Sequence, residues 1–419
     1  MTLACGLDFG TSNSTIGFAG TQGPQLLPVE GESRTIPSTI FFSFEDGSTH
    51  FGRAALGEYV TGGEGRLMRA LKSVLGTSLI ADTTPIGKRR VPFTEILGIF
   101  IGEVKARAET ALGAPLDTVV VGRPVQFVDD DAKADAQAQA QLEGAVRAQG
   151  FSQIAFQFEP IAAALDYERQ VDDEQLALIV DLGGGTSDFS LVRVGPERAR
   201  ASDRQGDILA TAGVHIGGTD FDRLLSMARV MPELGLGTMT ADGKRNLPVA
   251  PYYDLATWHR INRLYTQKTL LDLNGTRKEA AQPARVDKLI AVIEDRQGHR
   301  LAGEVEAAKI ALSDSPQVGL HFETRGGDIG TQITAQQLSG VLEDAVGRIM
   351  AAIDRTLALG GIGPGDVHSL ILTGGSTLVP VVVKRLRAAF PGARFVRTDV
   401  LGSVGLGLSI DAARKFGTR

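Results

Sequence analysis

Two glycine-rich turns, almost half a chain apart, constrain the fold of this chain more than any other feature of its sequence. The first is GLDFGTSNS at residues 6–14, and the second is VDLGGGTSDFS at residues 180–190. In both, an apolar stretch compatible with a β-strand ends in aspartate and enters the turn, and a second such stretch leaves it. The pattern predicts two β-hairpins with bare tips, and its recurrence predicts a duplicated lobe.

Such tips are suited to binding phosphate groups. Glycine allows positive φ and a close approach, so the backbone N–H groups of a bare tip form a concave anion site. The aspartates Asp8, Asp181 and Asp188 suit a magnesium ion that neutralises the phosphates, held directly or through water. We therefore predict a polyphosphate clamped between the two turns, with further contacts from the hydroxyl and N–H groups of Thr11, Ser12 and Thr186.

Length, composition and charge restrict the class of protein. A chain of 419 residues is too long for one simple core, so two or more packed lobes are expected. Its 43% hydrophobic and 22% charged content is typical of a soluble globular protein, and a net charge of −6 argues against general affinity for nucleic acid or anionic membranes. The lone cysteine, Cys5, excludes an internal disulfide. We find no secretory signal and no run of ~18–20 apolar residues, so we expect a cytoplasmic protein.

Strands that alternate with helices indicate an α/β protein. Further strands are predicted at residues 40–44, 118–124, 154–158 and 369–373. Helices are predicted at residues 66–75, 94–113, 129–149, 161–168, 303–313, 336–359, 379–390 and 402–416. Residues 231–298 look less regular, and they hold Pro232, Pro248, Pro251 and the only tryptophan, Trp258.

Two charged residues outside the turns are candidates for phosphoryl-transfer chemistry, which needs positioning and charge neutralisation. Lys72 could reach a terminal phosphate, and Glu159, at a strand-to-helix junction before Pro160, could polarise a water or hold the metal shell. By default they are a solvated lysine and a carboxylate favoured by a helix N-terminus. Sequence spacing alone does not bring them to the turns. The six histidines lack metal-ligand spacing and are assigned no role.

The whole chain resembles the ATPase domain of the Hsp70 family, in the actin-like superfamily. The two glycine-rich turns resemble its phosphate motifs, LTGGSTLVP at residues 372–380 resembles its adenosine motif, and FEPIAAALDY at residues 158–167 resembles the segment with its catalytic glutamate. Three further segments are similar to family motifs: VGRPVQF (121–127), IGGTDFD (216–222) and EAAKIALS (306–313). LMRALKSVLG at residues 67–76 looks closest to the short YegD-like members, which consist of the ATPase domain without a peptide-binding domain.

The resemblance implies an α/β fold of the actin-like, ribonuclease H-like kind, with two duplicated lobes and a nucleotide cleft between them. Lobe I would span residues 1–175, with residues 395–419 returning to it and an outer subdomain at residues 40–95. Lobe II would span residues 176–394, with an outer subdomain at residues 220–315.

The resemblance also implies ATP or ADP with Mg²⁺, and K⁺ as an accompanying monovalent cation. Lys72, Glu159, Asp181 and Thr186 would form the catalytic set, with Lys72 and Glu159 acting on the γ-phosphate and the attacking water. Asp8, Asp181 and Asp188 would bind the magnesium shell. The nucleotide-binding residues that it implies are Gly10, Thr11, Ser12, Asn13, Gly183, Gly184, Gly185, Thr186, Gly217, Gly218, Glu306, Lys309, Ser313, Gly374, Gly375, Ser376 and Leu378.

The sequence also departs from the family pattern. Leu378 stands where members often have an arginine that stacks on adenine, and Ile310 supplies no second guanidinium, so adenine would lie between aliphatic side chains. The proline of the interdomain relay is present as Pro124, but Ala132 stands in place of its partner arginine. At residues 399–402, Asp-Val-Leu-Gly replaces the closing Asn-Pro-Asp-Glu pattern. With no interdomain linker or peptide-binding β-sandwich before Arg419, we do not expect an ordinary substrate-holding chaperone cycle.

Three functions are weighed. The leading hypothesis is a slow magnesium-dependent ATPase that opens and closes its lobes as a chaperone-like switch, with an unidentified protein client or cochaperone. The alternatives are an actin-like filament-forming ATPase and a small-molecule kinase of the same superfamily. A partner surface on residues 231–298 is weighed against proline-rich packing of the outer subdomain, which we favour. No nucleic-acid or membrane partner is expected.

Overall fold

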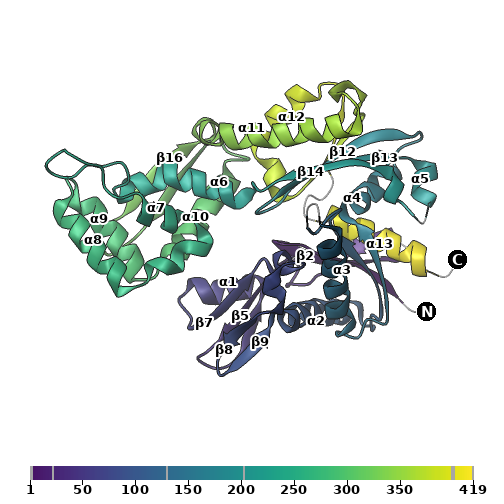
Figure 1. Cartoon of the computed structure of the whole chain (residues 1–419), viewed down its shortest axis with the longest axis horizontal. Coiled ribbons are helices and arrows are strands. Elements are labelled where there is room, and N and C mark those ends of the chain that lie inside the picture. The colour runs from purple at the N-terminus through teal and green to yellow at the C-terminus, as the bar shows by residue number, and fades with distance from the viewer. Residues whose placement is uncertain (1–2, 21–22, 129–130, 202, 398–401, 418–419) are drawn as a thin grey trace.

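The computed structural model describes residues 3–20, 23–128, 131–201, 203–397 and 402–417. The chain forms two lobes, each built on a mixed β-sheet with helices packed against it (Figure 1). The lobe made mainly from the first part of the chain is purple to blue, and the other lobe is teal to yellow (Figure 1). Among the described residues, we find no helix with the length and apolarity that crossing a membrane requires.

The two central sheets have the same topology. In lobe I the strand order is β11-β10-β1-β2-β3, and in lobe II it is β14-β13-β12-β17-β18. Each begins with an antiparallel hairpin, and each adds two parallel strands beside the first strand of that hairpin. The strands of lobe I are β1 (Ala4–Phe9), β2 (Asn13–Gly20), β3 (Gly23–Leu26), β10 (Thr118–Arg123) and β11 (Gln153–Phe158), with the short β4 (Ile36–Pro37) beside β2. Those of lobe II are β12 (Gln175–Leu182), β13 (Ser187–Val194), β14 (Ile208–Val214), β17 (Ser369–Thr373) and β18 (Arg394–Arg397).

The hairpins predicted from the two glycine-rich turns are therefore confirmed, as is the α/β class. Asp8 pairs with Thr15 across the first hairpin, and Asp181 pairs with Asp188 across the second. In each sheet the hairpin's first strand lies in the middle of the order, buried between neighbours on both sides. Its carboxyl end, which carries the aspartate, points to the cleft between the lobes.

Two helices that lie far apart in the sequence cross between the sheets. They are α4 (Glu159–Glu168) and α13 (Ser403–Phe416). A Cβ atom placed on Gly407 of α13 would overlap with the carbonyl oxygen of Ala162 in α4, so the two backbones touch at the crossing. A core cluster of residues from both lobes surrounds it. This crossing ties the lobes together at the floor of the cleft.

The predicted helix at residues 66–75 is wrong. Residues 65–69 form strand β7 (Gly65–Arg69), and the 3-10 helix η1 (Leu71–Val74) follows. Strand β7 pairs with β5 (Thr39–Ser43), whose other edge is taken by β6 (Thr49–Phe51). Pairing with an open strand edge and burial of Met68 outweigh local helix propensity here. Around this small sheet lie helix α1 (Gly52–Val60), 3-10 helix η2 (Ser78–Ala81) and the hairpin of β8 (Thr83–Ile86) with β9 (Arg89–Pro92).

Residues 231–298 are more regular than expected, because they are largely helical. Pro232, Pro251 and Pro283 each occupy the first turn of a helix, where the missing N–H would have no intrahelical partner. The prolines therefore start helices instead of interrupting them. The elements are the 3-10 helices η5 (Met231–Leu234) and η6 (Trp258–Leu264), and helices α7 (Ala250–Ala256), α8 (Gln267–Glu279) and α9 (Pro283–Glu294).

The other predicted helices and strands are found within a few residues of their expected bounds. The helices are α2 (Phe93–Leu112), α3 (Ala132–Arg147), α10 (Gly298–Ala311), α11 (Ala335–Gly360) and α12 (Pro380–Ala389), together with α4 and α13. Elements without a sequence prediction include α5 (Pro196–Arg200), α6 (Gly218–Leu225), the π-helix η4 (Ser226–Val230) and the hairpin of β15 (Gln317–Phe322) with β16 (Ile329–Thr334). Within the replaced Asn-Pro-Asp-Glu segment, residues 399–401 lie outside the described residues.

The outer parts of the lobes touch across the mouth of the cleft through five side chains, which we call the outer clasp. They are Tyr59 and Arg69 from lobe I, and Trp258, Asn262 and His299 from lobe II. The rings of Tyr59 and His299 lie 4.7 Å apart, and Asn262 donates a hydrogen bond of 2.6 Å to the Tyr59 hydroxyl. The Arg69 guanidinium lies 4.5 Å from the centre of the Trp258 ring. The cleft is therefore bounded by contacts between the lobes at both its floor and its mouth.

The buried His299 makes stability depend on pH. Burial lowers the pKa of His299 from 6.5 to about 4, although the Trp258 carbonyl partly opposes this effect. The unfolded chain then binds the extra proton between these values, so the stabilisation present above pH 6.5 is lost as pH falls towards 4. We expect His299→Phe to reduce the loss of unfolding free energy between pH 7.5 and 5 by about 2 kcal/mol. Denaturant unfolding at both pH values measures it, with the exposed His259→Phe as control. Equal pH dependence in all three proteins would refute the prediction.

Candidate functional site

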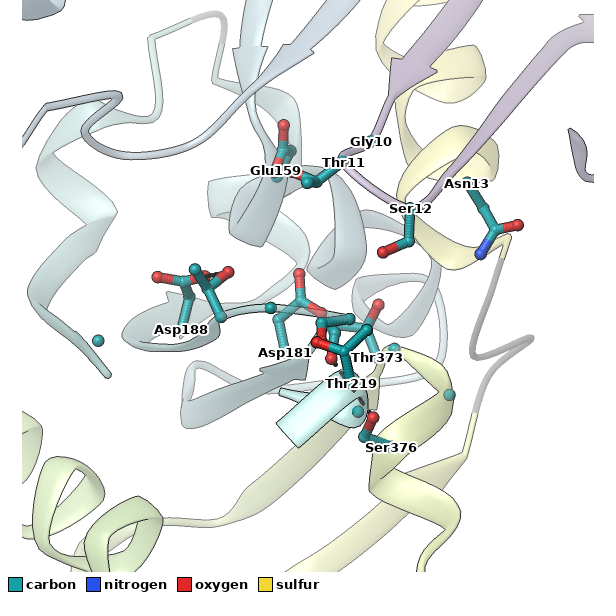
Figure 2. Close-up of a pocket in the computed structure, with 18 of the residues that line it drawn as sticks. Gly10, Thr11, Ser12, Asn13, Glu159, Asp181, Asp188, Thr219, Thr373 and Ser376 are labelled. Carbon is teal, nitrogen blue, oxygen red and sulfur yellow. Dashed lines mark hydrogen bonds between the residues drawn. The ribbon is translucent and has the colours of Figure 1, made fainter. Parts of the chain in front are cut away.

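A cleft of about 1630 Å³ lies between the lobes, and the tips of both hairpins line it. A Cβ atom placed on Gly184 would overlap with the Ser12 side chain, so the two tips meet across the cleft. Figure 2 shows Glu159 and the Gly10–Asn13 tip on one side, with Asp181, Asp188 and Thr219 facing them. The turns that lie far apart in the sequence therefore form one site.

Backbone contacts fix the shape of each tip. The Ser38 hydroxyl donates a hydrogen bond of 2.7 Å to the Gly10 carbonyl in the first tip. In the second tip, the N–H of Gly183 donates to the Thr186 carbonyl at 2.9 Å. A Cβ atom on Gly217 would lie 2.5 Å from the backbone of Gly184, so Gly217 has to be small for the chain to pack behind this tip.

Almost all of the predicted site residues line the same cleft. Gly217 is the exception, because it supports the second tip from behind. The predicted residues that line the cleft are Asp8, Gly10, Thr11, Ser12, Asn13, Lys72, Glu159, Asp181, Gly183, Gly184, Gly185, Thr186, Asp188, Gly218, Glu306, Lys309, Ser313, Gly374, Gly375, Ser376 and Leu378.

Lys72 and Glu159 form an ion pair at the floor of the cleft. Lys72 comes from η1 in lobe I and is only 9% exposed, and Glu159 is the first residue of α4. Burial acts to lower the pKa of Lys72, but the negative charges of Glu159 and Asp8 outweigh it and raise this pKa above its ordinary value. Lys72 is therefore a buried, protonated cation beside the two hairpin tips, a position that the default interpretation of a solvated lysine did not anticipate.

The carboxylates at the hairpin ends repel one another. Burial, together with the negative charge of Asp188, raises the pKa of Asp181 to about 8. Burial likewise raises the pKa of Asp8 to about 7, with Glu159 adding to the effect and Lys72 opposing it. The Thr186 hydroxyl donates a hydrogen bond of 3.1 Å to Asp188. Negative charge is thus concentrated where a bound cation would relieve the repulsion.

This set of oxygen ligands fits a hydrated magnesium ion. Mg²⁺ prefers oxygen ligands, keeps several waters and uses one or two carboxylates together with phosphate oxygens. Among the described residues, no three histidine, cysteine, aspartate or glutamate side chains lie close enough together to hold an ion by themselves. Asp8, Asp181 and Asp188 would therefore hold the ion with water and phosphate completing its shell.

Lobe II contributes a second charged pair, of which only Lys309 was predicted from the sequence. Lys309 of α10 lies 2.7 Å from Asp222 of α6, and its ammonium also donates to the Gly218 carbonyl at 3.3 Å. Burial raises the pKa of Asp222 to about 6, although Lys309 opposes this shift. Asp222 was given no role from the sequence, even though it ends the IGGTDFD motif. It holds Lys309 against the glycine turn beside Glu306.

The expected aliphatic region lies on the same side of the cleft. Ile310 is 58% exposed and Leu378 is 40% exposed, and both line the cavity. Beside Leu378, the Ser376 hydroxyl donates a hydrogen bond of 3.3 Å to the Gly183 carbonyl. Gly374 has a φ of 80°, and a Cβ there would overlap with the Leu182 carbonyl, so this turn requires glycine. The turn after β17 thus packs directly on the second hairpin tip.

Two sheets of one topology, a crossing pair of helices and an intervening cleft lined by both hairpin tips define the actin-like ATPase fold. The sequence model of the family described as Hsp70 protein matches residues 81–231 and 279–412. The chain belongs to the Hsp70 family.

Curated relatives agree with this assignment. The chaperone protein DnaK of Thermotoga neapolitana is 28% identical over 416 residues, which cover 99% of this chain and 59% of the relative. The DnaK proteins of Thermotoga petrophila and Thermotoga maritima are each 27% identical over the same share of both chains. The chain therefore spans 59% of the length of these relatives.

Proposed function

We propose that this protein binds ATP with Mg²⁺ in the cleft and hydrolyses it slowly, with closing and opening of the lobes as the output. The observation that carries the proposal is the meeting of the two bare tips at Ser12 and Gly184, in the cleft that the Lys72–Glu159 pair also lines. One moving body would comprise residues 1–175 and 395–419, and the other residues 176–394. Helix α4 of the first body packs on α13 and on β12, β13 and β17 of the second body, and this packing would form the hinge between the two bodies.

In this mechanism the amides of both tips bind the oxygens of the β- and γ-phosphates. Lys72 stabilises the negative charge of the γ-phosphate, which draws its ammonium away from Glu159. Glu159 then orients the attacking water and accepts its proton. A bound Mg²⁺ supplies further charge neutralisation at the phosphates. Lys309, Glu306 and Ser313 would hold the ribose and adenine on lobe II.

We propose the biological role of this ATPase cycle from the family to which the chain belongs. The Thermotoga relatives are named chaperone proteins, and we propose a chaperone-like switch here, acting on a protein client or cochaperone. Isothermal calorimetry with ATP in MgCl₂ and in EDTA, followed by single-turnover hydrolysis, tests the nucleotide step. We expect binding that depends on magnesium and turnover slower than one per minute, an order-of-magnitude expectation for a switch. The absence of binding heat in both buffers would overturn the proposal.

The raised pKa of Asp181 predicts a conflict between stability and metal binding. A carboxyl whose pKa rises from 3.8 to about 8 on folding stabilises the folded state only at low pH, and this contribution is lost as pH rises towards 8. We therefore expect nucleotide-free Asp181→Asn to be more stable than wild type at pH 8, by at least about 1 kcal/mol, and equally stable at pH 4. The variant should also lose most of the thermal stabilisation that ATP with Mg²⁺ gives the wild type.

Thermal unfolding at pH 4 and pH 8, with EDTA or with ATP and MgCl₂, measures both effects. The exposed Asp344→Asn on α11 is the matched control, and it should follow the wild type under every condition. If Asp181→Asn were as unstable as the wild type at pH 8, the proposed repulsion at the site would be wrong.

A further inference from the structure

We propose that Arg69 is a positioning residue that couples closure of the outer clasp to the placement of Lys72, through the left-handed residue Ala70. This inference rests on the proposed ATPase function. It goes beyond that function because it names the element through which a contact at the mouth of the cleft acts on a residue at its floor.

One short segment of lobe I reaches both places. Arg69 is the last residue of β7, where it pairs with Thr39, and its guanidinium stacks on Trp258 of lobe II. Three residues later, Lys72 reaches Glu159 at the start of α4. The negative charges of Asp222 and Glu306 also attract the Arg69 guanidinium towards the lobe II side of the site. A movement of lobe II therefore displaces Arg69 and, with it, the segment that carries Lys72.

Ala70, between these two side chains, has a strained backbone. Its φ is 53° and its ψ is 40°, which is the left-handed helical conformation. Among the non-glycine residues that the structure describes, only Ala70 and Arg296 have positive φ. For an L-residue this conformation costs about 1–2 kcal/mol, and alanine has no polar side chain to compensate locally.

The contacts on either side of Ala70 hold it in this conformation. The N–H and hydroxyl of Ser73 both donate to the Ala70 carbonyl, at 3.0 and 2.7 Å, which fixes the following turn. On the other side, Arg69 is anchored by the stacking on Trp258, an interaction worth about 0.5–1 kcal/mol at an exposed site. That energy is comparable with the strain. When the clasp opens, the strain is released and Lys72 leaves its position beside the tips.

The test compares Arg69→Met, which removes the cation, with Arg69→Lys, which keeps one over the Trp258 ring. We expect Arg69→Met to lower kcat for ATP hydrolysis about tenfold while KM changes less than about threefold, because Lys72 acts on the transition state. Arg69→Lys should recover most of this loss. Trp258→Leu should behave like Arg69→Met, and the double variant should be no worse than either single one.

A second-site change distinguishes positioning from a general structural role. In glycine the left-handed conformation carries no strain, so Ala70→Gly no longer needs the clasp to hold it. We expect Ala70→Gly to restore kcat in the Arg69→Met background to within about threefold of wild type. A merely structural loss at Arg69 would not be rescued by this substitution.

A third measurement needs no nucleotide. The side chain of Lys72 is 9% exposed and that of Lys105 is 15% exposed, so both should react slowly with an amine-acylating reagent. In Arg69→Met we expect labelling of Lys72 to accelerate at least about fivefold, while Lys105, held by Glu109 and the Gln149 carbonyl, serves as the internal control. Peptide mass spectrometry of the full chain reads out both rates.

The outcomes separate the two proposals. If the wild type hydrolyses ATP while Arg69→Met and Trp258→Leu match its kcat and its labelling of Lys72, the coupling is wrong and the ATPase proposal stands. If the wild type neither binds nor hydrolyses ATP, the ATPase proposal fails. In that case faster labelling of Lys72 in Arg69→Met would still support the mechanical link, and unchanged labelling would overturn it.

Discussion

Replacing Glu159 with glutamine is expected to slow ATP hydrolysis by about 100- to 1,000-fold while leaving nucleotide binding nearly unchanged. Glutamine has almost the same shape and can still accept a hydrogen bond from Lys72, but it cannot take a proton from water at neutral pH. Lys72→Ala is expected to lower kcat by a similar factor, because it removes the cation that would stabilise the γ-phosphate charge. Single-turnover hydrolysis and calorimetry measure chemistry and binding separately.

Two exposed residues supply matched controls for these variants. Lys88→Ala lies in the turn between β8 and β9 of the same lobe, and Glu197→Gln lies on α5, where the glutamate side chain is 85% exposed. Both are expected to turn over ATP at the wild-type rate. Wild-type turnover in Glu159→Gln would remove Glu159 from the mechanism, and loss of binding in that variant would point to a structural role.

Gly407→Ala is expected to destabilise the whole protein by about 3 kcal/mol or more. The added methyl group would overlap with the carbonyl oxygen of Ala162, so the crossing helices α4 and α13 must separate. Overpacking of a rigid core usually costs about 1–3 kcal/mol, and here the obstacle is backbone, which has no alternative rotamer. Because both lobes pack on this crossing, the loss should appear in one cooperative denaturant transition or split it into two.

The natural comparison is Gly144→Ala in helix α3. Among the described residues, no atom beyond the neighbouring backbone of α3 lies within 4 Å of the methyl group that this substitution adds. The substitution should therefore stabilise the helix by about 0.5–1 kcal/mol. Both variants make the same chemical change at a helical glycine, which isolates the effect of the crossing. Equal stability of the two variants would mean that the lobes are not held at α4 and α13.

The parts of the fold that depend on local patterns could be predicted from the sequence. Both hairpins, their strand-end aspartates and the long helices follow from apolar periodicity and glycine placement. The helix predicted at residues 66–75 is wrong, because β7 pairs with the open edge of β5. This pairing is a long-range interaction, which local helix propensity does not take into account. The helices of residues 231–298 were missed because the segment looked irregular, although Pro232, Pro251 and Pro283 each lie in the first turn of a helix.

For the site, the residue types could be predicted but the contacts between them could not. The two tips gave the phosphate-binding expectation directly, whereas the pairing of Lys72 with Glu159 depends on η1, whose structure was not predicted. Asp222 carried a signal, since it lies in a motif that was noticed, but no spacing rule places it against Lys309. No pattern in the sequence indicated the outer clasp, because its residues come from four separate elements of the two lobes.

The position of α13 has a consequence for how the protein is made. This helix packs on β1 and β2, so the first strands of the chain are covered by its last described helix. A protein leaving the ribosome would have an open, apolar face on its first sheet until residues 403–416 emerge. Contacts between such distant parts of a chain form slowly and leave intermediates prone to aggregation. Completion of lobe I therefore waits until residues 403–416 have left the ribosome, and nascent chains are expected to require protection until then.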